Sequence, residues 1–372
     1  MSVEKNSDYQ IKLVFLQKQV CKMKYSNSSI QKAGKILLKS KDPEEVAQAE
    51  RIIEAWRGQH DIVLDEFEKK LLPLLQEEKV SIIDRGRRLK RLKAITNKMD
   101  KHEVWNLSTM QDIGGMRLIL PSLDVVFQTK YLLETLGVED FEISDSCDYI
   151  DSPRSTGYRA VHLVFKYTPK DEKHECYGQK IELQLRTRYQ HIWAMGVETA
   201  ELITGTALKD GIENDEWQVF FKSISVCFYC ADIDHSNCTQ EKKREAAILA
   251  KTENINSKFI EELRSMMTMV VVDIDEFKST DDSVCEGYYL MDINYKSRLS
   301  RILFFKKEEK DKAIELYNRQ ERDNVGQPKD VVLVSVPSLK NLRDMYPSYY
   351  FDAAEFITLA CSFVNKDRED KF

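Results

Sequence analysis

The stretch Asp148–Thr187 restricts the possible folds of this chain more than any other segment. It begins with residues that break regular structure, among them Pro153 and Gly157, and continues into the apolar run Val161–Tyr167. After a polar segment, residues 181–186 alternate strictly between apolar and polar side chains. The pattern predicts a glycine-containing loop that enters one strand and is followed by a second, half-buried strand.

The alternating strand is expected to present three polar side chains on one face. Because successive side chains of a strand point to opposite sides, Glu182, Gln184 and Arg186 should project together, each about 6.5 Å from the next. A carboxylate, an amide and a guanidinium in one row suit a metal-bound, phosphate-rich ligand. Alternation alone is also typical of an ordinary half-exposed strand with a polar outer face, so other residues have to decide between the two interpretations.

Strand and helix signals alternate upstream of this segment. Met116–Leu120 predicts a strand, and Leu123–Leu136 predicts a helix that follows an N-cap at Ser122. Gly137 would end that helix, and Phe141–Ile143 starts another strand. This order predicts the α/β (α+β) class, with a mixed sheet flanked by helices.

A second carboxylate strengthens the phosphate-transfer interpretation. Asp112 precedes two glycines and the predicted strand at Met116–Leu120. Together with Glu182, Asp112 could complete a two-carboxylate magnesium site of the kind that phosphate-transfer enzymes use. The sequence therefore predicts a metal site made by Asp112 and Glu182.

The segment Lys79–Lys101 holds nine basic residues against two acids. On a helix or turn it would place Arg88, Lys90 and Lys98 around a common ligand. The alternative is a charge run on a solvated helix, which needs no ligand.

These segments, in this order, resemble the synthetase domain of the RelA/SpoT family, the ATP-dependent nucleotide pyrophosphokinases, over about Lys79–Glu198. The resemblance implies that Arg88 and Arg117 sandwich the adenine of ATP, as planar guanidinium groups can. It implies further that Lys90 and Lys98 bind the triphosphate. The catalytic set would be Asp112, Glu182 and Gln184, with magnesium on the two carboxylates.

The resemblance also assigns the loop Pro153–His162 to the acceptor nucleotide. Tyr158 would stack on the acceptor base, Gly157 would let the backbone approach, and His162 would contact phosphate or ribose. The remaining acceptor-binding residues would be Arg154 and Glu198. The chain departs from the family pattern at Arg154, Thr156 and Thr199, where the family usually has lysine, asparagine and often histidine.

The charge distribution bears on possible partners. The net charge is −6, so any nucleic-acid binding has to come from local basic stretches. Residues 11–41 contain eight lysines and no acid. They form either a solvated lysine face or an electrostatic surface for a phosphate backbone, to which Lys18, Lys22 and Lys24 would contribute.

The location is expected to be cytoplasmic. No apolar run approaches the roughly 18 residues of a membrane span, and the N-terminus lacks a signal-peptide core. The eight cysteines have irregular spacing, which favours reduced thiols. A zinc site is a weaker alternative, and its candidate ligands are Cys227, Cys230, His235 and Cys238.

The rest of the chain is expected to be largely helical before the synthetase region and α+β after it. A helix that starts at Asp42 is expected to end at Trp56–His60, and a further helix is expected through Phe67–Leu74. Residues 270–372 predict a small α+β module whose first part is acidic. The expected domains are residues 1–269 and 270–372.

The Trp-Arg-x-x-His helix and the Tyr-Pro-x-Tyr segment together resemble CapRel proteins, which are fused toxin–antitoxin members of the toxic small alarmone synthetases. The resemblance implies a toxin that transfers pyrophosphate from ATP to the 3′ CCA end of tRNA. It also implies a C-terminal antitoxin that is released by a phage capsid protein. Tyr346 and Tyr349 would block the ATP site in the closed state, unless they only pack the module's own core.

Two other functions remain open from the sequence. A (p)ppGpp synthetase with GDP or GTP as acceptor could use the same loop, because stacking tolerates different bases. A nucleotide-sensing binding module is a non-enzymatic alternative, but it would not need both Asp112 and Glu182. The sequence does not indicate an oligomeric state.

Overall fold

The computed structural model describes residues 25–101, 106–204, 216–233, 258–261, 263, 271–274, 286–294, 296–297, 299–324, 327, 329–346 and 353–364. These residues form one nine-stranded sheet in the order β3-β4-β5-β2-β1-β9-β7-β8-β6. The strands are β1 (Asp84–Leu89), β2 (Gly114–Leu120), β3 (Phe141–Asp148), β4 (Val161–Tyr167), β5 (Lys180–Thr187), β6 (Val271–Ile274), β7 (Gly287–Asn294), β8 (Leu299–Lys306) and β9 (Lys329–Val336). The helices are α2 (Asn27–Lys39), α3 (Pro43–Glu77), α4 (Leu92–Lys101), α5 (Leu123–Leu136), α6 (Arg188–Thr204), α7 (Glu216–Asp232), α10 (Lys310–Asp323), α11 (Leu339–Met345) and α12 (Ala354–Val364).

The sheet is mixed, as the sequence predicts. The strand pairs β2–β5 and β6–β8 are parallel, and the other neighbouring pairs are antiparallel. The predicted strands at Met116–Leu120, Val161–Tyr167 and residues 181–185 are all confirmed. The α/β class with a mixed sheet and flanking helices is therefore correct.

The C-terminal strands extend the same sheet as the N-terminal ones. Strand β9 pairs with β1, where Arg87 is opposite Ser335 and Arg88 is opposite Val334. Strand β1 therefore has a partner on both edges, because β2 occupies its other side. The expected domain boundary at residues 269/270 lies outside the described residues and stays a prediction.

Helix α3 is a single helix of 35 residues and does not end at Trp56–His60 as the sequence suggested. Its start is as expected, since the Asp42 side chain accepts a hydrogen bond from the Glu44 backbone N–H and Pro43 occupies the first turn. His60 bonds the Trp56 carbonyl within the helix instead of ending it. The buried face of the helix continues through Phe67, so packing overrides the local stop signal.

The basic segment Lys79–Lys101 is also different from the expected helix or turn. Its first part is strand β1, and only Leu92–Lys101 is helical. The strand forms because β2 and β9 supply hydrogen-bonding partners on both sides, information that a local charge pattern does not contain.

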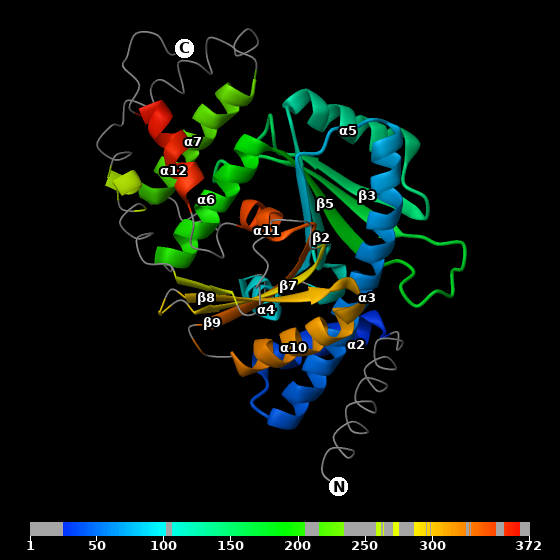
Figure 1. Ribbon diagram of the computed structural model, residues 1–372. Helices are drawn as coiled ribbons and strands as arrows, with labels where there is room; N and C mark the ends of the chain where they lie inside the picture. The colour runs from blue at the N-terminus through cyan, green and yellow to red at the C-terminus, as the bar shows by residue number, and fades with distance from the viewer. Residues whose placement is uncertain are drawn as a thin grey trace.

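Helices cover both faces of the sheet (Figure 1). Helices α3 and α5 bury one face, in a core that includes Phe67, Leu118 and Leu183. Helices α6, α7 and α12 pack together beside the other face, around Phe220 and Phe356. Helix α11 lies on that second face as well, over a core that includes residues of β2, β7 and β9.

The described C-terminal elements have the α+β character that the sequence predicts for residues 270–372. Strands β7 and β8 form an antiparallel hairpin, α10 and α11 are helices, and β9 is a strand. Within the described part of the chain, no helix combines the length and apolarity that crossing a bilayer requires.

Candidate active site

Register across three strands brings the predicted polar residues together. Arg117 of β2 is opposite Gln184 of β5, and Gln184 is opposite His162 of β4. In the neighbouring row, Arg88 of β1 is opposite Gly115, and Gly115 is opposite Glu182. Because partners in register share a face, these side chains project from one side of the sheet, away from the core under α3 and α5.

The predicted polar face of β5 is confirmed by direct hydrogen bonds. Gln184 Nε2 donates to Glu182 Oε2 at 2.7 Å, and Arg186 Nη2 donates to Gln184 Oε1 at 2.8 Å. Gln184 therefore fixes the distance between a carboxylate and a guanidinium. Arg186 is a site residue that the sequence analysis placed in the row but did not assign a role.

This polar face forms the floor of a cleft of about 890 Å³. Most of the residues that the sequence proposed for catalysis, ATP binding and acceptor binding line it. They are Arg88, Lys98, Asp112, Arg117, Arg154, Tyr158, His162, Glu182, Gln184 and Glu198. The sequence thus identified a spatial cluster from segments that are far apart along the chain.

Asp112 lies just before β2, between two lysines. Lys90 Nζ is 2.7 Å from Asp112 Oδ2, and Lys98 Nζ is 3.1 Å from each carboxylate oxygen. Burial raises the pKa of Asp112, but the charges of Lys90 and Lys98 outweigh burial and lower it overall. The carboxylate is therefore ionised at neutral pH, and the two lysines lie where the phosphates of a ligand on Asp112 would need them.

Glu182 belongs to a chain of hydrogen bonds that ends at Tyr158. His162 Nδ1 lies 2.8 Å from Glu182 Oε1, and His162 Nε2 lies 2.6 Å from the Tyr158 hydroxyl. The Tyr158 hydroxyl also accepts a hydrogen bond from Arg186 Nη2 at 2.8 Å. A carboxylate, an imidazole and a phenol are thereby held in a fixed order on one side of the cleft.

The charges in this chain of hydrogen bonds shift the pKa values of Glu182, His162 and Tyr158. Burial raises the pKa of Glu182, but His162 lowers it to about 2 overall. Burial lowers the pKa of His162, but Tyr158 and Glu182 raise it to about 9. Burial raises the pKa of Tyr158, but the charges of Arg186 and His162 lower it to about 8. At neutral pH the site therefore contains an imidazolium beside a carboxylate.

The acceptor loop is held from two sides. Gly157 has a φ of +91°, which favours glycine, and a Cβ there would lie 3.1 Å from the Lys222 Cα of α7. The Arg154 guanidinium lies 4.5 Å from the ring centroid of Tyr149 and donates to its hydroxyl at 3.1 Å. Tyr149, which the sequence analysis missed, lines the cleft as well. Its aromatic side chain directly before the loop was the available signal.

Arg117 is buried under the C-terminal part of the chain. Its Nη1 donates to the Met345 carbonyl at 3.3 Å, and its guanidinium carbon lies 5.8 Å from the ring centroid of Tyr346. Nearby, His191 Nε2 lies 2.9 Å from the Asp344 carbonyl. Burial, and then the charge of Arg186, lowers the pKa of Arg117 to about 10. The arginine expected to stack on adenine thus has a tyrosine ring beside it.

Helix α6 completes the wall of the cleft. Glu198 lines the cleft, as expected for an acceptor-side carboxylate. Thr199, where the family often has histidine, is fully buried and its hydroxyl bonds the Met195 carbonyl in the same helix. Thr156, another departure from the family pattern, does line the cleft.

Several predicted residues lie outside the described residues. They are Lys18, Lys22, Lys24, Tyr349, His235 and Cys238. Cys227 and Cys230 are buried free thiols on α7. Among the described residues, no group of three or more His, Cys, Asp or Glu side chains is placed to hold a metal ion.

The chemistry of Asp112 and Glu182 fits a magnesium ion shared with substrate phosphates. Both carboxylates line the cleft, and both have lowered pKa values, although the negative charge of Glu182 acts to raise the pKa of Asp112. Magnesium often takes only one or two protein carboxylates and completes its octahedron with water and phosphate. Two ionised carboxylates are therefore enough protein ligands for such a site. In this structure Asp112 is paired with Lys90 and Lys98, and Glu182 with His162.

Residues 87–202 match the family model described as a region found in RelA/SpoT proteins. This segment contains the cleft-lining strands β2, β4 and β5 and helix α6. The match agrees with the RelA/SpoT resemblance read from the sequence for this part of the chain. The resemblance to CapRel proteins stays a prediction.

Two curated relatives align with the same part of the chain. GTP pyrophosphokinase YjbM from Bacillus subtilis (strain 168) is 35% identical over 105 residues, which cover 27% of this chain and 46% of that protein. GTP pyrophosphokinase YwaC from the same organism is 26% identical over 156 residues, which cover 38% of this chain and 73% of that protein. The chain thus spans less than half the length of the first relative.

Solved structures of small alarmone synthetases are also similar. Small alarmone synthetase 1 from Bacillus subtilis, bound to its product pppGpp, is 24% identical with a TM-score of 0.41, covering 48% of this chain and 91% of that one. Small alarmone synthetase 2 from the same organism is 23% identical with a TM-score of 0.40, covering 46% and 90%.

Proposed function

We propose that this protein is an ATP-dependent pyrophosphokinase that transfers the β,γ-diphosphate of ATP to a hydroxyl group of a second nucleotide. The observation that carries the proposal is the convergence of Asp112, Glu182 and their cationic neighbours in one cleft of a RelA/SpoT-type region. The names of the two curated relatives support the same reaction class.

The positively charged side chains in and beside the cleft indicate where ATP would bind. Lys90 and Lys98 lie within hydrogen-bonding distance of Asp112, so they can turn to the phosphates of ATP and neutralise charge on the transferred group. Arg88 and Arg117 project from the same face of β1 and β2, and guanidinium planes at both positions can stack on adenine. Magnesium on Asp112 and Glu182, when bound, would supply further charge neutralisation for the phosphates.

The chain of hydrogen bonds at Glu182 indicates how the acceptor hydroxyl group would be positioned. A carboxylate with a pKa of about 2 is a weak base, so Glu182 orients the acceptor hydroxyl in the ground state more than it removes its proton. His162 holds the carboxylate from one side and Gln184 from the other. A loose phosphoryl transition state needs little base strength and depends mainly on such positioning.

The first candidate acceptor is GDP or GTP, which makes the protein a (p)ppGpp synthetase. Both curated relatives are named GTP pyrophosphokinases. The Tyr149, Arg154 and Tyr158 side chains cluster at the mouth of the acceptor loop and offer ring and guanidinium faces to a base.

The second candidate acceptor is the 3′ CCA end of tRNA, which makes the protein a toxin that inhibits translation. The eight lysines without an acid in residues 11–41 favour this acceptor, because a mononucleotide does not need a long basic surface. Lys18, Lys22 and Lys24 are the proposed tRNA contacts.

With either acceptor, we propose that the C-terminal part inhibits the enzyme at rest. The contacts of Met345 and Tyr346 with Arg117 support this proposal, because they occupy one side of the guanidinium that adenine would need. A phage capsid protein that displaces this segment is the proposed trigger, and the proposed role is antiviral defence in the cytoplasm.

The acceptor is tested with the full-length protein, γ-labelled ATP and magnesium, and with GDP, GTP or bulk tRNA offered separately. Tyr346→Leu is assayed in parallel because the wild-type chain is expected to be inhibited. Label in a guanosine tetra- or pentaphosphate supports alarmone synthesis, and label at the tRNA 3′ end supports the toxin. If neither the wild-type protein nor Tyr346→Leu labels any acceptor, the proposed function is wrong.

A further inference from the structure

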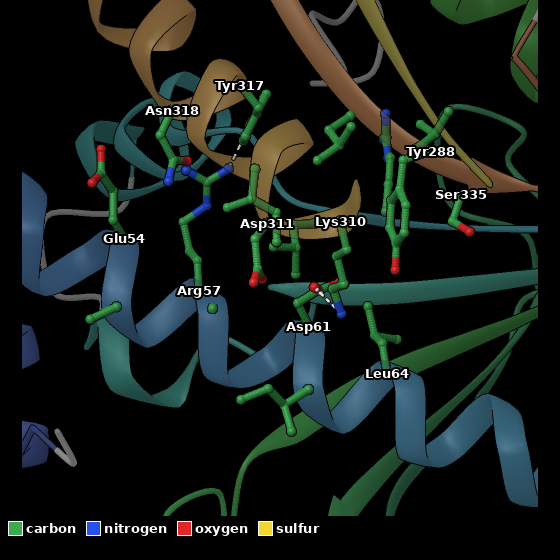
Figure 2. A pocket seen from close by; sticks show the side chains of 18 of the residues that line it. Glu54, Arg57, Asp61, Leu64, Tyr288, Lys310, Asp311, Tyr317, Asn318 and Ser335 are labelled. Atoms are coloured by element: carbon green, nitrogen blue, oxygen red, sulfur yellow. Dashed lines mark hydrogen bonds and ion pairs between the residues drawn. The ribbon is translucent and has the colours of Figure 1, made fainter. Parts of the chain in front are cut away.

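A second cavity, of about 720 Å³, lies on the sheet face opposite the cleft. Helix α3 forms one wall, and β1, β9 and α10 form the others (Figure 2). Most of its surface is apolar, and the contributing residues include Ala55, Ile62, Leu64, Leu89, Ile314 and Leu333. A cavity of this size and character is typical of a small-molecule site.

Arg57, the arginine of the Trp-Arg-x-x-His segment, reaches into this cavity from α3. Only 2% of it is exposed. Its Nη1 bonds Glu321 at 2.7 Å and its Nη2 bonds the Tyr317 hydroxyl at 2.5 Å, both on α10. Among the described residues, its Nε has no hydrogen-bond partner. One buried donor of this arginine therefore remains to be satisfied.

Arg87 supplies a second such donor from β1. Its side chain is 8% exposed. Its Nη2 forms an ion pair with Asp65 and donates a hydrogen bond to the Tyr288 hydroxyl at 3.1 Å. Its Nη1 has no partner within the described part of the chain. Leaving a buried donor without an acceptor costs about 1–3 kcal/mol. A ligand that brings an acceptor would recover part of that free energy.

The charges around the cavity restrict the ligand further. Glu54, Asp61 and Asp311 line the cavity, and Lys310 Nζ pairs with Asp61 at 2.7 Å (Figure 2). These carboxylates disfavour a multiply charged anion such as a nucleotide phosphate. Arg57, Arg87 and Lys310 disfavour a cation for the same reason. An uncharged acceptor satisfies the free donors without either penalty.

We propose that this cavity binds a small, largely apolar molecule that carries an uncharged hydrogen-bond acceptor such as a carbonyl group. The acceptor meets the side chain of Arg57 or Arg87, both of which line the cavity, and the apolar body packs between α3 and α10. Because the walls come from α3 and from the C-terminal elements α10 and β9, the ligand holds these parts of the chain together. The proposal does not depend on the reaction in the cleft.

Three naphthalene probes of equal size test the proposal on the full-length protein. They are 2-naphthamide, 2-naphthoate and 2-naphthylmethylamine. Binding of each probe is measured by saturation-transfer NMR and by the shift in the thermal unfolding temperature. We expect 2-naphthamide to bind and to raise the unfolding temperature, and the other two to bind at least tenfold more weakly. Equal binding of all three, or no binding of 2-naphthamide, would overturn the proposal.

Two cavity-blocking variants locate the binding. Ile314→Trp fills the cavity from α10, and Ala47→Trp covers its rim from an exposed position of α3. Gln48→Trp is the matched control, because Gln48 is an exposed neighbour that does not line the cavity. Loss of 2-naphthamide binding in Ala47→Trp, with normal binding in Gln48→Trp, is the expected result. Unchanged binding in Ala47→Trp and Ile314→Trp would place the ligand elsewhere and contradict the proposal.

Discussion

The Tyr346 ring lies 5.8 Å from the guanidinium carbon of Arg117, although the two residues are far apart in the sequence. Tyr346 is 3% exposed, and its hydroxyl lies near Gly86 of β1, where an added Cβ would be 2.9 Å away. Arg117 belongs to β2 and lines the cleft, and Tyr346 directly follows α11 of the C-terminal part. This contact links β2 with the C-terminal part of the chain at the proposed ATP site.

The contact leads to a prediction about inhibition. Tyr346→Leu keeps an apolar side chain in the core but removes the ring from Arg117, so ATP binding should strengthen and basal transfer should rise at least tenfold. Isothermal titration with a non-hydrolysable ATP analogue and a transfer assay measure both effects. Met345→Leu is the matched control, because Met345 contacts Arg117 through its backbone carbonyl, which the substitution retains. Equal activity of both variants and the wild type would place the inhibitory contact elsewhere.

The two carboxylates of the cleft give a prediction about catalysis. Asp112→Asn and Glu182→Gln should each lower transfer by at least about a hundredfold, since each removes a charge that binds metal or orients the acceptor. The test is made in the Tyr346→Leu background, with circular dichroism to verify folding. Asp145→Asn, at another acid that lines the cleft, should leave transfer within a few-fold. Substantial transfer by Asp112→Asn or Glu182→Gln would refute the assignment.

The His162–Glu182 pair gives a prediction about pH and stability. The folded-state pKa of His162, about 9, lies above its unfolded value of about 6.5. The stabilisation that this shift supplies should therefore be complete below about pH 6.5 and lost as the pH rises through 9. Urea unfolding of the wild type and of His162→Gln at pH 6 and pH 9.5 measures it. The difference between the two proteins should shrink by on the order of 2 kcal/mol at the higher pH. A difference independent of pH would show that His162 is not charged in the folded protein.

The lysine-rich N-terminus gives a prediction about the acceptor. Charge reversal at Lys18, Lys22 and Lys24 should weaken tRNA binding and reduce the slope of its salt dependence. ATP binding should persist, because the proposed ATP contacts are other residues, namely Arg88, Lys90, Lys98 and Arg117. Filter binding at several salt concentrations makes the comparison. Unchanged tRNA affinity would leave GDP or GTP as the favoured acceptor.

Many of the residues that line the cleft could be predicted from the sequence, because short local patterns identify them. Strict alternation in residues 181–186 identifies the face that Glu182 and Gln184 share, and β5 confirms it. The loop glycine at Gly157 was expected to allow a close approach, and its closest neighbours belong to α7 of the same chain. The pairing of Lys90 and Lys98 with Asp112 was not expected, because the distance between opposite charges depends on the tertiary structure.

The parts that the sequence did not predict depend on long-range pairing. The basic segment around Arg87 is a strand because it pairs with β2 on one side and with β9 from the C-terminal part on the other. The signal near His60 resembles a helix end, yet α3 continues because its next turns are buried against the sheet. For the same reason the fragment 1–269 would leave an edge of β1 without its partner, so functional tests require the full chain.

The most direct test of the proposed pyrophosphokinase activity is the identity of the nucleotide that remains after transfer. Full-length Tyr346→Leu is incubated with ATP, magnesium and the acceptor that becomes labelled, and the products are separated by ion-exchange chromatography. Transfer of a diphosphate predicts one AMP for each modified acceptor, with both the β- and γ-phosphates of ATP on the acceptor. ADP as the product, with a single phosphate on the acceptor, would contradict the assignment.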